Sequence, residues 1–316
     1  MARVTSKVAT SDELAAPELT APGWTVTEAV AACKRLTKAH SSTFYLGSRL
    51  FPKHKRDAVH VVYAVCRSGD DAVDEASSLE QGRANLARWW QGIERAYAGT
   101  PQIDKEDSNN ALELALSWAL THFEIPKEAF YELYLGLESD LRRDVCYETL
   151  DDLMLYCRRV AGVVGFLIAP IAGYRGGEVT LEQALALGQA MQLTNILRDV
   201  GEDFGKGRCY LPEDLVAKHN INLDRLRAGY VDANYVALLE ELCDLTHKLY
   251  RQGWQGIPKL EGIASVAVGV AALNYESILR KLRQNHYDNL SRRAFLRTHE
   301  RLVLIPRAVF SVFSSW

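Results

Sequence analysis

Residues 58–75 read Ala-Val-His-Val-Val-Tyr-Ala-Val-Cys-Arg-Ser-Gly-Asp-Asp-Ala-Val-Asp-Glu. Apolar side chains recur at intervals of three and four, as at Ala58, Val61, Val62 and Val65, which is the repeat of an amphipathic helix. The stretch ends in four carboxylates within six residues. A helix C-terminus is the less favourable end for negative charge. A helix that breaks a local rule in this way is a candidate functional element.

The same helical repeat continues through most of the 316-residue chain, and runs that alternate like strands are poor. Pro52, Pro126 and Pro212 stand at or just before the beginning of helical patterns, where a missing N–H costs little. Thr180 with Gln183 predicts a capping box that opens a helix. We therefore predict an all-α fold, with helices at 25–39, 53–76, 79–98, 108–123, 127–142, 151–172, 180–203, 231–255, 260–287 and 298–313.

Composition narrows the class of protein. Hydrophobic residues make up 48% and charged residues 24%, as in globular domains, and the net charge of -3 argues against a general nucleic-acid binder. The six cysteines form no C-x-x-C pair and no secretory signal is visible, which favours reduced thiols in the cytoplasm. The longest uncharged run, 160–174, is too short to span a membrane and is expected inside the core. We predict a flexible tail over 1–22 and one domain over 23–316.

Two acidic faces suggest a metal site. Asp70 and Asp74 are four residues apart and share one helix face, although like charges at this spacing cost about 0.2–0.5 kcal/mol per pair. Asn195, Asp199 and Asp203 repeat the spacing further along the chain. Carboxylate and amide oxygens suit Mg²⁺, which commonly bridges to substrate phosphates. Two such helices facing each other would hold Mg²⁺ ions over a diphosphate.

Other interpretations remain open at this point. A single D-x-x-x-D more often marks a solvated helix face than a metal site. Two such motifs, each extending an apolar helix, favour a solvated face and a metal site about equally. A di-iron bundle would need Glu-x-x-His pairs, which the sequence lacks. The stretch 201–207 is one residue short of a P-loop and continues with glycine, and no G-x-G-x-x-G is present. Phosphate-loop and nicotinamide sites are therefore not indicated.

Six ordered stretches resemble the squalene/phytoene synthase family of head-to-head prenyltransferases, over residues from about 25 to 300. Two of them are similar to the phytoene-forming branch: Thr-Phe-Tyr-Leu-Gly at 43–47, and Tyr-Asp followed by Arg-Arg-Ala at 287–294. Chain-elongating prenyl synthases and terpene cyclases share D-D-x-x-D at 70–74 but pair it with a different second motif. The stretches are 40–47, 63–74, 156–165, 192–203, 207–212, and 275 with 287–294.

The resemblance implies a single-domain isoprenoid-synthase helical bundle around a central apolar cavity. It also implies the condensation of two geranylgeranyl diphosphates, through a cyclopropyl diphosphate, to phytoene, the first committed step of carotenoid biosynthesis. The expected cofactor is Mg²⁺, with Mn²⁺ as a substitute and no NADPH. A squalene, hydroxysqualene or dehydrosqualene synthase acting on farnesyl diphosphate is the alternative. A non-catalytic helical assembly or membrane-docking protein is a third hypothesis.

Residue roles follow from the acidic spacing together with the resemblance. The expected metal ligands are Asp70, Asp74, Asn195, Asp199 and Asp203. The four aspartates and Tyr156 form the expected catalytic set, with Tyr156 or released diphosphate as the final proton acceptor. The expected diphosphate-binding residues are His40, Ser41, Phe44, Arg67, Gln192, Arg208, Tyr210, Tyr275 and Arg292.

Several of these residues have structural alternatives. Ser41 fits a helix cap equally well, and Arg67 could be a counter-ion to the aspartates. Tyr45, Tyr134 and Phe166 are candidate walls for carbocations, or ordinary core. Residues 280–301 carry seven Lys or Arg against two acids, which indicates mainly a solvated face. Attraction of this basic stretch to an anionic membrane surface is the lesser interpretation. The expected partners are prenyl diphosphates and, as a peripheral contact, a membrane; no nucleic acid is expected.

Overall fold

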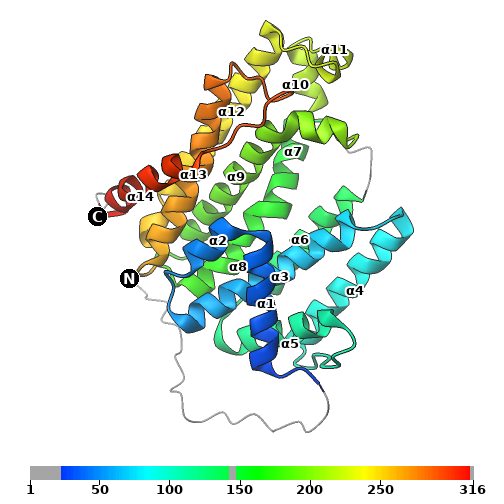
Figure 1. Cartoon of the computed structure of the whole chain (residues 1–316), viewed down its shortest axis with the longest axis vertical. Helices are drawn as coiled ribbons and strands as arrows, with labels where there is room; N and C mark the ends of the chain where they lie inside the picture. Colours follow the sequence, from blue (N-terminus) through cyan, green and yellow to red (C-terminus); the bar gives the residue numbers. More distant parts are fainter. Residues whose placement is uncertain (1–22, 142–146, 314–316) are drawn as a thin grey trace.

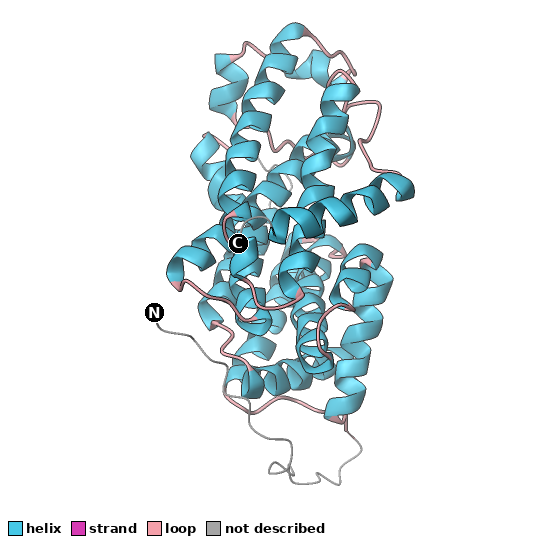
Figure 2. Ribbon diagram, turned by 90° about the vertical axis from the view of Figure 1, so that its left-hand side faces the viewer, coloured by secondary structure: helices cyan, strands magenta, loops and turns pink. Residues whose placement is uncertain are grey.

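The computed structural model describes residues 23–141 and 147–313, and in this part of the chain no strand forms. Figures 1 and 2 show helices throughout, which confirms the all-α prediction. The helices are α1 (Val26–His40), α2 (Ser42–Ser48), α3 (Lys53–Asp74), α4 (Leu79–Tyr97), α5 (Ser108–His122), α6 (Lys127–Asp140), α7 (Leu150–Cys157), α8 (Val163–Ala172), α9 (Glu178–Gly205), α10 (Glu213–Lys218), α11 (Leu223–Arg227), α12 (Ala233–Trp254), α13 (Ala264–Gln284) and α14 (Thr298–Phe313).

The predicted helix starts lie within two residues of the observed ones, except at α13. Pro52, Pro126 and Pro212 each precede the first residue of a helix, as predicted. The predicted capping box at Thr180 is wrong, because α9 begins two residues earlier, after Gly177. The Thr180 hydroxyl instead donates to the Arg175 carbonyl oxygen at 2.6 Å and helps to fix the preceding turn.

Short helices escaped the periodicity analysis. α2, α10 and α11 have seven, six and five residues, which is too short to show a repeat of 3.6. α13 begins at Ala264, because a 3₁₀ turn (Ile257–Lys259) and Gly262, with φ of 56°, come first. The predicted tail at 1–22 lies outside the described residues.

The predicted helix 151–172 is interrupted in its middle. A π-helical turn (Arg158–Gly162) joins α7 to α8. Such turns inside helices frequently occur at functional sites. By length and composition the run Leu150–Ala172 could cross a membrane. In the structure it packs against α6 and α9 and buries Leu153, Val163 and Leu167, as a core helix does.

Two clusters of buried apolar residues hold the bundle together. One gathers side chains from α1, α3, α4, α5, α6 and α8, and the other from α7, α9, α12 and α13. Figure 1 shows these groups at its lower and upper ends, with α8 and α9 running between them. Close approach of α8 and α9 requires Gly165, where a Cβ would lie 2.8 Å from the backbone of Ala184. This junction brings together the helices that carry the acidic residues.

The cysteines agree with the expected reduced state. Cys33, Cys66, Cys157, Cys209 and Cys243 are free thiols. Burial raises the pKa of each, so that these thiols stay protonated at neutral pH. Cys146 lies outside the described residues.

Candidate functional site

Three helices bring carboxylates to one place at or near their C-terminal ends. α3 ends at Asp74, α6 ends at Asp140, and α9 carries Asp203 in its last turn. The charges of Asp74 and Asp203 both raise the pKa of Asp140, so Asp140 lies within reach of both acidic faces. The negative ends of three helix dipoles add to this charge. Residues of both sequence motifs therefore create a negative electrostatic potential at this place, which favours the binding of a cation.

The aspartates of the first motif have two different surroundings: Asp70 and Asp74 lie at the site, and Asp71 is paired with Arg67. Burial raises the pKa of Asp70 to about 7, against the opposing charge of Arg67 and with the repulsion of Asp74 and Asp140. Arg67 forms an ion pair with Asp71, which lies on the adjacent face. Asp74 is half-exposed and lies 3.2 Å from Arg208, which follows the second motif. The Asp74–Arg208 pair connects the two motifs.

The second acidic face offers a mixed set of donors. The Asn195 Oδ1 is buried without a hydrogen-bond partner in the part of the chain that is described, while its amide nitrogen donates to Gln192 at 3.4 Å. Burial alone would raise the pKa of Asp199, but hydrogen bonds from Arg198 and Arg293 outweigh it and lower the pKa. Burial and Asp199 raise the pKa of Asp203 to about 6.

Arg293, not its neighbour Arg292, contacts the second acidic face. The Arg293 Nε lies 2.7 Å from the Asp199 Oδ1. Arg292 is 74% exposed and lies 3.9 Å from Asp288. The sequence analysis chose Arg292 from two adjacent arginines whose spacing alone does not separate them.

A clamp formed by residues 287–293 holds Arg293 against α9. The Gly201 N–H donates to the Asn289 carbonyl oxygen at 3.2 Å. The Asn289 side chain, which is 3% exposed, donates to the Leu197 carbonyl oxygen at 2.6 Å and accepts from Tyr235 at 2.8 Å. These buried bonds fix the segment that places Arg293.

Tyrosines line the side of the site next to α6. The rings of Tyr147, Tyr156 and Tyr210 pack together with centroids 5.3–6.2 Å apart, and Tyr210 stacks on both of the others. The Tyr156 hydroxyl donates to the Asp140 Oδ2 at 3.1 Å. Burial and the charge of Asp140 raise the pKa of Tyr156 well above its usual value, so Tyr156 holds its proton. Burial raises the pKa of Asp140 to about 7, although the hydrogen bond from Tyr156 and the charge of Arg208 oppose the rise.

The α1–α2 junction contributes a further wall. Phe44 stacks on Tyr63 at a centroid distance of 4.8 Å, and the Phe44 N–H donates to the Ser41 hydroxyl oxygen at 3.3 Å, as a cap does. Tyr63 in turn hydrogen-bonds to Ser41. Burial raises the pKa of Tyr63, the charges of Asp70 and Tyr275 add to the rise, and the charge of Arg67 opposes it. This junction therefore lies beside the first acidic face. His40 is the exposed last residue of α1.

Asp140 is a site residue that sequence reasoning missed. Asp144 follows it at a spacing of four, the same D-x-x-x-D spacing as in the two motifs, but the sequence analysis did not single out this pair. Its Oδ1 is buried and lacks a hydrogen-bond partner among the described residues. The available signal was an aspartate in the last turn of a helix, the same rule that Asp74 breaks.

The donors fit Mg²⁺ only with a bound diphosphate. Across residues 23–141 and 147–313, no three His, Cys, Asp or Glu side chains lie close enough to hold a metal ion by themselves. Mg²⁺ needs one or two carboxylates and takes its remaining ligands from water and substrate phosphates. The unpaired oxygens of Asn195 and Asp140 are hard acceptors of this kind. The residues therefore suit metal ions that arrive with a diphosphate.

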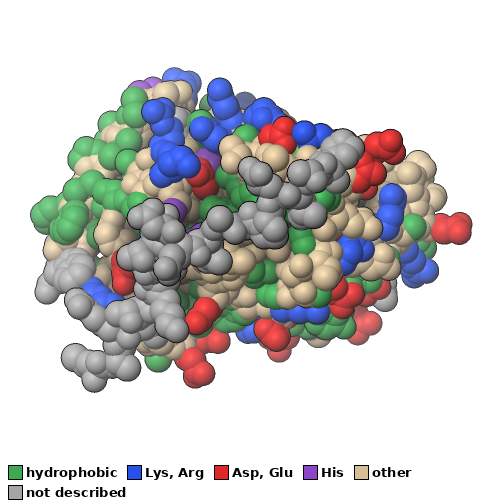
Figure 3. All heavy atoms as spheres, turned by 90° about the horizontal axis from the view of Figure 1, so that it is seen from below, with side chains coloured by type: hydrophobic (Ala, Val, Ile, Leu, Met, Phe, Trp, Pro, Cys, Tyr) green, Lys and Arg blue, Asp and Glu red, His purple; other side chains and the backbone are tan. Residues whose placement is uncertain are grey.

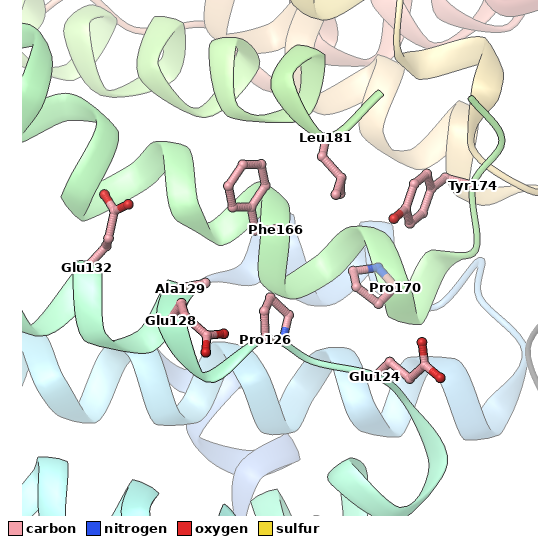
Figure 4. Close-up of a pocket in the computed structure, with 9 residues that line it drawn as sticks. All are labelled: Glu124, Pro126, Glu128, Ala129, Glu132, Phe166, Pro170, Tyr174 and Leu181. Atoms are coloured by element: carbon pink, nitrogen blue, oxygen red, sulfur yellow. The ribbon is translucent and has the colours of Figure 1, made fainter. Parts of the chain in front are cut away.

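A separate pocket lies between α6 and α8 (Figure 4). It encloses about 360 Å³ and is lined by Phe166, Pro170, Leu181 and Tyr174, with Glu124 and other glutamates at its edge. Phe166, one of the candidate cavity walls, lies here. The residues predicted to bind metal or diphosphate do not line this pocket in the described part of the chain.

Comparisons with known proteins agree on the family. The squalene/phytoene synthase family model matches residues 37–300. The chain is 47% identical to a phytoene synthase of Thermus thermophilus, over 88% of this chain and 91% of the relative. It is 34% identical to a 15-cis-phytoene synthase of Synechococcus elongatus, over 90% and 93% of the two chains. A dehydrosqualene synthase crystal structure superimposes with a TM-score of 0.81 at 29% identity, over 92% of this chain and 98% of that one.

Proposed function

The chain belongs to the squalene/phytoene synthase family, and from this membership we propose that it is a phytoene synthase. It condenses two molecules of geranylgeranyl diphosphate head to head, through a cyclopropyl diphosphate, to phytoene. The observation that carries this function is the 47% identity to the Thermus phytoene synthase along nearly the whole of both chains. The reaction supplies the first committed intermediate of carotenoid biosynthesis.

The metal requirement is the finer part of the proposal. Asp70 and Asp74 on α3, with Asn195, Asp199 and Asp203 on α9, would hold Mg²⁺ against the diphosphate. The bound metal would neutralise the leaving diphosphate and so promote ionisation. Mn²⁺ offers the same hard coordination, and no NADPH is required because this reaction forms phytoene without reduction.

Cationic and hydroxyl groups around the two faces orient the diphosphate. Arg208, which bridges to Asp74 at 3.2 Å, and Arg293, at 2.7 Å from Asp199, are placed to exchange these carboxylates for phosphate oxygens. We propose Arg67, Ser41 and Tyr275 as further contacts to the diphosphate. His40, Phe44, Gln192 and Tyr210 remain proposed contacts from the family pattern, and we propose Arg293 in place of the exposed Arg292.

Asp140 orients Tyr156 by accepting a hydrogen bond of 3.1 Å from the Tyr156 hydroxyl. The Tyr156 pKa is raised well above 10, so the hydroxyl donates to an oxygen rather than acting as an anion. We assign Tyr156 a catalytic role at the reacting diphosphate and Asp140 a positioning role. Packing against Tyr147 and Tyr210 excludes water from this side.

The test is incubation of the purified protein with geranylgeranyl diphosphate and Mg²⁺, without a reductant, and analysis of extracted hydrocarbons. Phytoene is the expected product. Asp70→Ala and Asp199→Ala should abolish it while the helical circular dichroism stays unchanged. Absence of any forty-carbon product under these conditions would refute the proposal, and retained biological activity in these variants would favour a non-catalytic role.

A second candidate is a synthase acting on farnesyl diphosphate. The TM-score of 0.81 to a dehydrosqualene synthase supports it, because that protein has the same fold and a different name from the phytoene synthases. Parallel incubation with farnesyl diphosphate, with and without NADPH, separates the two: a thirty-carbon product made faster than phytoene would support this candidate. We further propose a cytoplasmic location with peripheral contact to a membrane.

A further inference from the structure

Helix α14 carries an apolar surface that the bundle does not cover. Its inner side buries Leu304, Ala308 and Val312, at 5% exposure or less, and α14 packs mainly on α13. Its other sides carry large apolar side chains that are 36–73% exposed. They are Leu302, Val303, Ile305, Val309, Phe310 and Phe313.

These exposed residues are concentrated on one helix. Among the described residues, six of the fifteen exposed large hydrophobic side chains lie on α14. α14 is the leftmost helix in Figure 1, and Figure 3, which keeps the same left and right, shows hydrophobic side chains gathered at that edge. Single exposed apolar residues are ordinary, whereas a contiguous patch indicates a binding surface.

Charge identifies the occupant. Arg297, Arg301 and Arg307 accompany the apolar surface, and no acid occurs from 301 to 316. Glu300, at the start of the helix, is paired with Lys281 at 2.5 Å. An apolar face with cations and no anions matches the interface of an anionic bilayer. A second copy of the chain fits less well, because a two-fold contact would place this cationic surface against itself.

We propose that α14 docks the protein on an anionic lipid membrane, lying in the plane of the interface. Val303 and Phe310, the two most exposed of the set at 71% and 73%, enter the acyl boundary. Arg297 and Arg307, both exposed, lie at the level of the lipid phosphates. The benefit to the enzyme, which rests on the proposed function, is that a forty-carbon hydrocarbon leaves directly into an apolar phase.

The surface can be tested with the full chain and lipid vesicles. In a flotation assay, most of the protein should rise with phosphatidylcholine–phosphatidylglycerol vesicles. A smaller fraction should rise with vesicles of phosphatidylcholine alone. Val303→Ser/Phe310→Ser should lower the partition coefficient about tenfold or more, because apolar insertion is lost. Arg297→Gln/Arg307→Gln should lower it about tenfold on anionic vesicles and little on neutral ones.

Matched controls separate this inference from the proposed reaction. Tyr131→Ser/Tyr230→Ser removes two other exposed aromatics, on α6 and before α12, and should bind vesicles like the wild type. Every variant is also assayed with geranylgeranyl diphosphate in detergent micelles, where α14 is not needed. Full activity with weak vesicle binding shows that docking failed while the catalytic site stayed intact.

Three outcomes would overturn the proposal. The first is equal vesicle binding by Val303→Ser/Phe310→Ser and the wild type. The second is binding that appears only after deletion of residues 1–22, which would make that segment the occupant of α14. The third is a dimer in solution that Val303→Ser/Phe310→Ser dissociates, which would make a second copy the occupant.

Discussion

Replacing Gly201 by alanine should loosen the clamp that positions Arg293. A Cβ at Gly201 would lie 2.4 Å from the Leu290 carbonyl oxygen and 2.8 Å from its Cα. Both atoms are backbone, so no side chain can rotate away. The segment is also anchored by the buried side chain of Asn289. Relief therefore requires moving the clamp, and with it the contact between Arg293 and Asp199.

The magnitude follows from a second glycine on the same helix. Alanine is favoured over glycine in a helix interior by about 0.5–1 kcal/mol. Gly205 is the last residue of α9, and nothing lies within 4 Å of an added Cβ there, so Gly205→Ala meets no clash but keeps only part of that gain. At Gly201, inside the helix, the full gain is set against an overpacking cost of about 1–3 kcal/mol. Because the propensity terms differ by less than about 1 kcal/mol, Gly201→Ala should be less stable than Gly205→Ala by up to about 3 kcal/mol.

Urea denaturation followed by circular dichroism gives the two free energies of unfolding, and phytoene formation gives the activities. Gly201→Ala should lose activity even where it is folded, because Arg293 is displaced, whereas Gly205→Ala should keep it. Equal stability and activity for the two variants would show that residues 287–293 do not press on α9 as described.

Three further predictions concern the site. Arg293→Gln should slow turnover about 10-fold to 100-fold through loss of a charged hydrogen bond, while Arg292→Gln stays near wild type; initial rates compare them, and an equal loss would contradict the geometry. Asp140→Asn should lower kcat by about 10-fold to 100-fold with a smaller change in KM, because Tyr156 is no longer held; an unchanged kcat would remove Asp140 from the site. The pKa of Asp203 is raised from 3.8 to about 6, so this carboxyl contributes stability that is present below about pH 4 and is lost as pH rises through 6. Because the ionised carboxylate is the metal ligand, the increase in melting temperature that Mg²⁺ gives over EDTA, with pyrophosphate present, should grow from pH 5 to pH 7. An increase that does not change with pH would argue against ligation by this carboxyl.

Long helices were predictable because their cause is local. Apolar spacing indicates which face of α3 is buried. Asp70 and Asp74 stand out because acids are unfavourable at the C-terminal end of a helix. The same reasoning found Asn195, Asp199 and Asp203. The bounds of the predicted helices differ from the observed ones by four residues at most, although a π-helical turn divides the helix predicted at 151–172.

What the sequence did not reveal depends on contacts between distant segments. Asp140 belongs to the site because α6 ends beside α3 and α9, and its D-x-x-x-D spacing with Asp144 does not by itself reveal that packing. The choice between Arg292 and Arg293 depends on how Asn289 is anchored to Leu197. Short helices such as α2 form with too few residues to display a period.

The long separation between Asp199 and Arg293 also has a consequence for the newly made chain. These two residues are 94 positions apart, yet their side chains meet in one ion pair. At about 5–20 residues per second, translation delivers Arg293 about 5–20 s after Asp199. A nascent chain therefore carries both acidic faces before their late cation is made. Partly synthesised molecules should be poor catalysts, so that activity starts only when the chain is nearly complete.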